Sequence, residues 1–93
     1  MSKGSVQKLK QFTYMIKAAE GLHARPAGLL VNCAKACTST VQISADGSEA
    51  DAKRLFSVMN LGISQNDTVI ITITGPDEET DCEKLRAFCE SNL

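Results

Sequence analysis

The sequence predicts an α+β fold in which an open sheet carries its helices on one face. Segments with apolar residues at every second position alternate with segments whose apolar residues recur at helical intervals. In addition, the Asp46-Gly47 dipeptide stands between two extended segments and indicates a hairpin, because both central residues of a type I′ turn need positive φ. The element order is therefore β-α-β-β-α-β-α, an open sheet with a helical layer.

The first half of the chain predicts a strand, a helix and a second strand. Residues 11–17 alternate and are expected to form a strand that ends before Gly21. Residues 24–37 have the pattern of an amphipathic helix. The positions expected to face the core in these two elements are Phe12, Tyr14, Ile16, Ala27, Leu30, Val31, Ala34 and Cys37. Alternation from Val41 to Ala45 then predicts the second strand.

The second half predicts two strands and two helices. A short strand over residues 48–51 is expected to pair with the preceding one, and residues 53–61 predict a short helix that ends near Gly62. Residues 68–74 are rich in β-branched side chains and form the clearest strand. The last helix begins after Pro76 with acidic residues in its first turn, and its inward positions are Cys82, Leu85, Phe88 and Cys89.

Length and composition indicate one globular domain over residues 9–93, preceded by a flexible leader over residues 1–8. The chain has 93 residues, of which 43 % are hydrophobic and 23 % charged. A net charge of −1 provides no basic field for nucleic acid. Because the sequence has neither a membrane-spanning apolar run nor a signal peptide, we expect a cytoplasmic protein without membrane insertion.

The four cysteines, Cys33, Cys37, Cys82 and Cys89, admit three interpretations. Two disulfides would require an oxidising compartment, which the sequence does not indicate. A structural zinc site is disfavoured, because the pairs are four and seven residues apart and zinc sites usually contain closer pairs. Helical spacing favours small buried hydrophobic residues, with Cys33 the most exposed. No metal and no cofactor is therefore expected.

The segment from Gly21 to Gly28 is the one that suggests chemistry. His23, the only histidine, falls where a loop meets the start of a helix. The unpaired N–H groups of Ala24 and Arg25, together with the helix dipole, predict an anion site beside the imidazole. A neutral imidazole is a nucleophile, and Arg25 could add a charge-assisted contact to a phosphoryl group. The alternative is that His23 and Arg25 are ordinary surface residues.

The motif G-L-H-A-R-P-A closely resembles the phosphohistidine signature of HPr, the phosphocarrier family of the bacterial phosphoenolpyruvate:sugar phosphotransferase system. The resemblance extends from about Leu9 to Leu93. It implies an open-faced β-sandwich, with a four-stranded antiparallel sheet and three helices on one face. It also implies that His23 accepts the phosphoryl group on Nδ1 from phosphorylated enzyme I and passes it to the IIA unit of a sugar permease, with Arg25 assisting. Such a protein is a carrier, not an enzyme, and is expected to be a monomer.

Leu55, Phe56 and Met59 predict a partner-binding patch on the short second helix. Residues three and four positions apart share a face of a helix, and this face differs from the one that carries Val58. Exposed apolar patches on small proteins are commonly docking surfaces. In HPr relatives the corresponding positions face the partner. The alternative is a helix buried on all sides.

Two positions depart from the family pattern. Many relatives have a regulatory serine where this chain has Arg54, so regulation by a serine kinase should be absent. Glu20 replaces a small polar residue, and we expect it to face solvent or pair with a cation, because it would repel a phosphoryl group. Two other functions stay open: a regulatory interaction module of the same fold, and a carrier in a nitrogen-related branch of the system.

Overall fold

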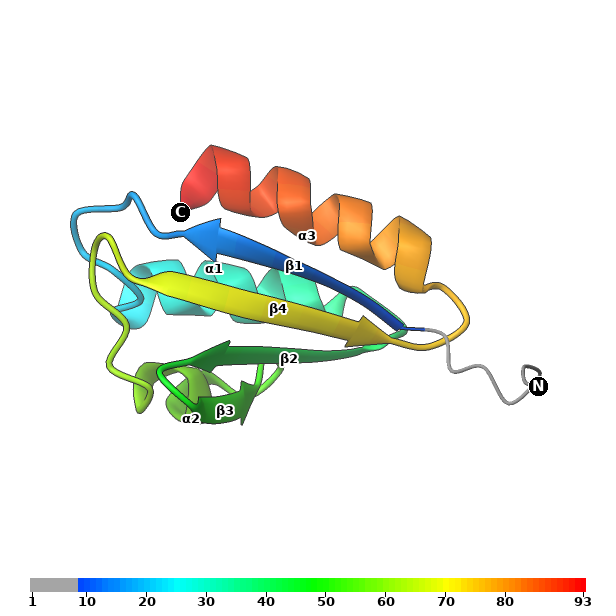
Figure 1. Ribbon diagram of the computed structural model, residues 1–93, viewed down its shortest axis with the longest axis horizontal. Coiled ribbons are helices and arrows are strands. Elements are labelled where there is room, and N and C mark those ends of the chain that lie inside the picture. The colour runs from blue at the N-terminus through cyan, green and yellow to red at the C-terminus, as the bar shows by residue number, and fades with distance from the viewer. Residues whose placement is uncertain (1–8) are drawn as a thin grey trace.

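Four antiparallel strands form a single sheet in the computed structural model, which describes residues 9–93. The expected leader over residues 1–8 lies outside the described residues. Within them the strands are β1 (Leu9–Met15), β2 (Thr40–Ala45), β3 (Ser48–Asp51) and β4 (Thr68–Thr74). Their order across the sheet is β1-β4-β2-β3, so β1 and β3 are the edges (Figure 1). The bounds of β3 and β4 agree with the prediction.

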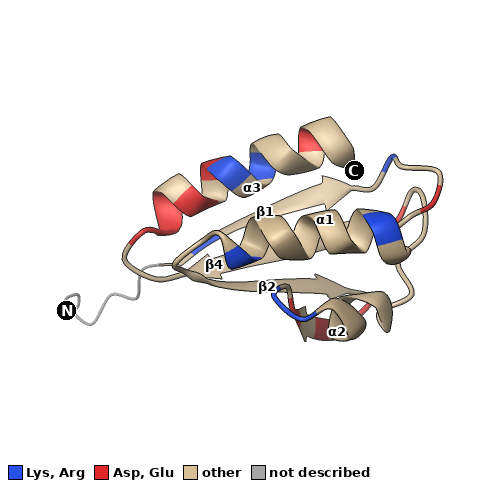
Figure 2. Ribbon diagram, turned by 180° about the vertical axis from the view of Figure 1, so that it is seen from behind, with Lys and Arg blue, Asp and Glu red and all other residues tan. Residues whose placement is uncertain are grey.

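All helices of the described chain lie on one face of this sheet. They are α1 (Ala24–Lys35), α2 (Leu55–Met59) and α3 (Glu78–Asn92). Figure 1 looks onto the uncovered face of the sheet, and Figure 2 shows the three helices from behind. The predicted α+β open-faced β-sandwich, with a four-stranded antiparallel sheet, is thus confirmed.

The core lies between the sheet and the helices. Alternate residues of the strands point into it, as the period of two requires. The predicted inward residues of α1 and the following turn are all buried, and in α3 only Phe88 is half-buried. The main buried side chains of the sheet are Phe12, Val41, Ile43, Val69, Ile71 and Ile73. The hydrophobic patterning of the sequence therefore identified the core.

The hairpin between β2 and β3 has the predicted turn. Asp46 and Gly47 both have positive φ, at 53° and 80°, and Ala45 pairs with Ser48. These angles match a type I′ turn, whose twist suits a two-residue hairpin. The register of β3 against β2 is therefore the one that a two-residue turn at this dipeptide predicts.

The first strand begins and ends two residues earlier than the predicted range 11–17. The ladder with β4 ends at Met15, and the backbone N–H groups that follow donate to residues outside β4. The N–H groups of Lys17 and Ala18 donate to the carbonyl oxygen of Leu93, at 2.6 and 2.7 Å. The alternating pattern continues through Ile16, but the backbone there already belongs to the loop.

Two helices are shorter than predicted. The helix expected over 24–37 ends at Lys35, because the N–H of Cys37 donates to the carbonyl oxygen of Ala34, three residues back, and closes a tightened last turn. The helix expected over 53–61 contains only Leu55–Met59. Apolar periodicity continues past both ends, because residues flanking a helix can still point into the core.

The four cysteines are free thiols, as the helical spacing indicated. Cys37, Cys82 and Cys89 are buried and Cys33 is half-buried. Burial raises the pKa of Cys37 to about 11 and that of Cys89 to about 12. Across residues 9–93 no group of three or more His, Cys, Asp or Glu side chains could hold a metal ion. In the same part of the chain, no helix is both long and apolar enough to cross a membrane.

Candidate functional site at the start of helix α1

His23 is the N-cap residue of α1, and Leu22 immediately before it anchors the loop. Leu22 is 2 % exposed, and its N–H donates to the carbonyl oxygen of Ile63 at 3.0 Å. A buried side chain and a buried hydrogen bond immediately before His23 fix where the helix begins. The imidazole is therefore presented from an anchored backbone.

Gly21 allows the loop to lie against the segment that follows α2. Its φ is +63°, and a Cβ at this position would lie 2.8 Å from Cα of Ser64 and still closer to the carbonyl oxygen of Ile63. Only glycine fits both the backbone conformation and the space. Figure 1 shows the two loops side by side at one end of the molecule.

The first turn of α1 has the arrangement that an anion site needs. The carbonyl of His23 accepts the first helical hydrogen bond, from the N–H of Ala27 at 2.8 Å, whereas its side chain makes no capping bond. The N–H groups of Ala24 and Arg25 have no acceptor within the helix, and Pro26 has no N–H. Since the side chains of His23, Ala24 and Arg25 are all exposed, an anion could approach these amides.

The charges near this turn favour an anion as well. Neither α1 nor α2 contains an acidic residue in its first turn, and Arg25 stands at the second position of α1. One cluster of carboxylates lies in the first turn of α3, at the end of the molecule away from the start of α1, although Figure 2 also shows acidic positions in red on the loops beside α1. Glu20, three residues before His23, is exposed.

The expected patch on α2 is partly open. Phe56 is 75 % exposed, whereas Leu55 and Met59 are half-buried. Val58 on the opposite side of the helix is fully buried. The alternative that α2 is buried on all sides is therefore wrong. Arg54 is the exposed N-cap of α2 and makes no side-chain capping bond.

Sequence reasoning did not identify the backbone partners that hold the site. Ile63 and Ser64 support the loop before His23, and the carbonyl of Leu93 holds the amides of Lys17 and Ala18. The usable signal was Gly21, together with Gly62, whose φ is +66°. Because Ile63 follows α2 closely, the loop that carries His23 and the helix that carries Phe56 share one support.

Comparison with known proteins agrees with the fold. Residues 10–91 match the family model described as the PTS HPr component phosphorylation site. The chain is 42 % identical to the phosphocarrier protein HPr of Buchnera aphidicola, over 78 % of this chain and 86 % of that protein. It is also 39 % identical to the HPr-like protein Crh of Halalkalibacterium halodurans, over 81 % of this chain and 89 % of that one.

A solved structure gives the same result. HPr of Thermoanaerobacter tengcongensis superposes with a TM-score of 0.85 at 37 % identity, covering 89 % of this chain and 93 % of that one. Fold and sequence thus define a small α+β protein of the phosphocarrier class. The chain belongs to the HPr family of the phosphotransferase system.

Proposed function

We propose that this chain carries a phosphoryl group on Nδ1 of His23, which it receives from phosphorylated enzyme I and delivers to the IIA units of sugar permeases. The observation that supports this most directly is the exposed His23 imidazole beside the two amides of α1 that have no helical acceptor. Membership of the HPr family supports the carrier role.

The transfer consists of two displacements at phosphorus. In the first, the lone pair of Nδ1 forms a bond to phosphorus while the bond between phosphorus and the donor atom of enzyme I breaks, and the donor keeps that electron pair. In the second, an acceptor atom of the IIA unit attacks, and the pair of the breaking bond returns to Nδ1. The chain is regenerated unchanged, so it is a carrier without catalytic turnover of its own.

The start of α1 would stabilise the group during both steps. The amides of Ala24 and Arg25 donate to the phosphoryl oxygens, and the positive end of the helix dipole opposes their charge. The guanidinium of Arg25 adds a charge-assisted contact. Fixed donors of this kind are effective because they need no reorganisation as charge develops. The mechanism requires no metal or other cofactor.

Leu55, Phe56 and Met59 are the surface that we propose for the partners. Enzyme I and a IIA unit must each bind, exchange the group and leave, which a small apolar patch permits. The common support of α2 and the His23 loop would keep patch and imidazole in a constant relation. Arg54 adds positive charge beside Phe56 and favours acidic partners.

The test is to incubate the purified chain with enzyme I and phosphoenolpyruvate and to measure the intact mass at neutral and acidic pH. We expect one acid-labile phosphoryl group, which His23→Ala abolishes. Because His23 is exposed and makes no capping bond, the free energy of unfolding of this variant should differ from that of the unmodified chain by less than about 0.5 kcal/mol. An adduct that survives His23→Ala would refute the assignment.

The role of Arg25 has its own test with a matched control. Arg25→Ala should slow transfer from enzyme I by about 10- to 100-fold, the usual value of a charge-assisted hydrogen bond. Lys35→Ala removes an exposed cation from the other end of α1 and should leave the rate unchanged. Equal rates for the two variants would remove Arg25 from the mechanism. A chain that never acquires the group would instead favour an interaction module of the same fold.

A further inference from the structure

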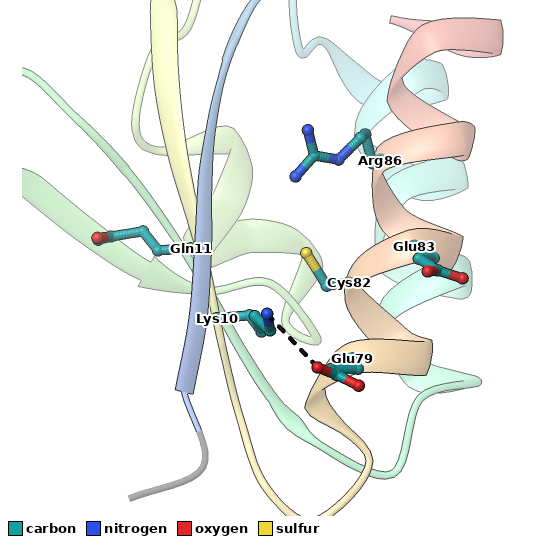
Figure 3. Close-up of a pocket in the computed structure, with 6 residues that line it drawn as sticks. All are labelled: Lys10, Gln11, Glu79, Cys82, Glu83 and Arg86. Atoms are coloured by element: carbon teal, nitrogen blue, oxygen red, sulfur yellow. Dashed lines mark ion pairs between the residues drawn. The ribbon is translucent and has the colours of Figure 1, made fainter.

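A hollow between β1 and the first half of α3 lies toward the end of the molecule opposite the start of α1. Its volume is about 460 Å³, and its lining residues are Lys10, Gln11, Glu79, Cys82, Glu83 and Arg86. Figure 3 shows Lys10 of β1 and Arg86 of α3 pointing into it from opposite sides. Gln11 points away from α3, and Glu83 points away from β1. Two cations therefore face this space.

Arg86 is held in place without a carboxylate partner. Its guanidinium carbon lies 4.9 Å from the centre of the buried Phe12 ring, a cation–π contact that limits its movement. Glu83 and Glu90 stand three and four positions from it on α3, the spacing at which helical ion pairs form. Among residues 9–93, however, no carboxylate pairs with Arg86. A guanidinium that is positioned and unpaired is suited to bind an anion from solution.

Lys10 already holds a carboxylate at the other end of the hollow. Its Nζ lies 3.6 Å from Oε2 of Glu79, and the two side chains are 46 and 76 % exposed. Exposed ion pairs of this kind contribute little to stability, so the carboxylate of a ligand can replace that of Glu79 at small cost. The pair thus shows which chemical group Lys10 accepts at this position.

The two cations are separated along the hollow. Glu79 and Arg86 are seven residues apart on α3, or about 10 Å along the helix axis, and Cys82 lies between them on the same side. Lys10 contacts the Glu79 end, and Phe12, two residues further along β1, contacts the Arg86 end. A molecule with an anionic group at each end matches this separation better than a single small anion.

We propose that this hollow is a binding site for a small dicarboxylate. One carboxylate of the ligand pairs with the guanidinium of Arg86, in the forked geometry that two N–H donors allow. The other carboxylate replaces that of Glu79 at Nζ of Lys10. The weakly polar side chain of Cys82 lies between the two cations and faces the carbon chain of the ligand.

This site is independent of the proposed phosphoryl transfer. It belongs to β1 and α3, whereas His23 precedes α1 and Phe56 belongs to α2. Helix α2 packs against α1 and β3, at the opposite edge of the sheet from β1. Dicarboxylate binding is therefore measured on the full chain alone, without enzyme I, and its failure would not bear on the role of His23.

The test is an amide NMR titration of the chain with glutarate at constant ionic strength. Pentanoate, which has the same number of carbons and only one carboxylate, and sulfate, whose charge is not divided between two ends, are the controls. The signals of Lys10, Cys82 and Arg86 should shift together with a dissociation constant on the order of 1 mM for glutarate. Pentanoate and sulfate should bind about tenfold more weakly. Equal binding of all three probes, or no saturable shift with glutarate, would overturn the proposal.

Charge variants test the two ends of the site. Arg86→Ala should weaken glutarate binding by about tenfold, and Arg86→Lys should restore part of this loss, because lysine keeps the charge but not the fork. Glu79→Gln should strengthen binding by about two- to fivefold, because the ligand then has no competitor at Lys10. Weaker binding in Glu79→Gln would show that the second carboxylate does not go to Lys10.

Lys84→Ala is the matched control for Arg86→Ala. It removes an exposed cation from the side of α3 near Cys33 of α1, away from the hollow, and should leave the affinity for glutarate unchanged. An equal loss of affinity in Lys84→Ala and Arg86→Ala would mean that glutarate responds only to the total charge, which would overturn the site. Unchanged affinity in Arg86→Ala would overturn it as well.

Discussion

Single residues around His23 determine whether an imidazole at the end of a loop can serve as a phosphoryl acceptor. The motif is the basis on which we propose His23, Ala24 and Arg25 as the phosphoryl site, because the chemistry of a helix N-terminus can be inferred from local sequence. It did not identify Ile63, whose carbonyl holds Leu22, because that contact depends on how distant segments pack. Gly21 belongs to the motif, and its backbone also lies against the distant residues Ile63 and Ser64.

Gly21→Ala should destabilise the chain by about 1–3 kcal/mol, because alanine is strained at positive φ and its Cβ would strike the backbone of Ser64. Gly28→Ala is the matched control. It lies within α1 with no atom close to the new Cβ, and it should stabilise the chain by about 0.4–1 kcal/mol. Urea unfolding measures both changes. Equal changes in the two variants would contradict the role assigned to Gly21.

The elements themselves were predictable in type and order, and their ends were less so. The observed bounds of β3 and β4 are the predicted ones, residues 48–51 and 68–74, since turn residues or polar boundaries delimit both strands. The ends of β1 and α1 differed, because they depend on Leu93 and on a tightened turn, neither of which leaves a mark in apolar spacing. In helix α2 the spacing of apolar residues correctly predicted that one side of the helix is buried and the other exposed.

Phe56 and Val58 separate these two sides of α2 experimentally. Because Phe56 is largely exposed, Phe56→Ala should change the free energy of unfolding by less than about 0.5 kcal/mol. It should nevertheless weaken docking to enzyme I by roughly five- to thirty-fold, as expected for an aromatic anchor. Val58→Ala should cost about 2 kcal/mol of stability through a cavity. Transfer kinetics at several carrier concentrations measure docking to enzyme I, and unfolding curves of the same variants measure stability. If Phe56→Ala docks as well as the unmodified chain, Phe56 is not part of the interface.

For the whole molecule, the layer arrangement followed from the sequence, but the strand order β1-β4-β2-β3 did not. Only the hairpin between β2 and β3 has a local signal; the pairing of β1 with β4 joins distant segments. Helix α3 is tied to the turn after α1 by Asp81, which is 3 % exposed and accepts the N–H of Ser39 at 3.0 Å. This buried carboxylate and the buried thiols make global stability depend on pH.

We expect the free energy of unfolding to fall at both ends of the pH range. Burial alone would raise the pKa of Asp81, but hydrogen bonding from Ser39 outweighs it and the pKa is lowered. Its contribution is therefore complete above the ordinary value of 3.8 and is lost as pH falls through the lower folded value. Burial raises the pKa of Cys37 and Cys89 above their ordinary 9.0, so stability decreases as pH rises from 9.0 through about 11 to 12.

Urea unfolding at a series of pH values measures this profile. Asp81→Asn should flatten the acid limb and leave the alkaline limb in place. Glu83→Gln, an exposed carboxylate of the same helix, is the control and should change stability by less than about 0.5 kcal/mol. An unchanged acid limb in Asp81→Asn would mean that another group controls it.

The short strand β3 has a consequence for how far such a sheet could extend. It spans only Ser48–Asp51, and the exposed Glu49 and Asp51 place two carboxylates along it. Brief, charged borders resist the addition of further strands. Growth of the sheet is therefore disfavoured at this border. The fold thus protects this side of its sheet against uncontrolled strand addition.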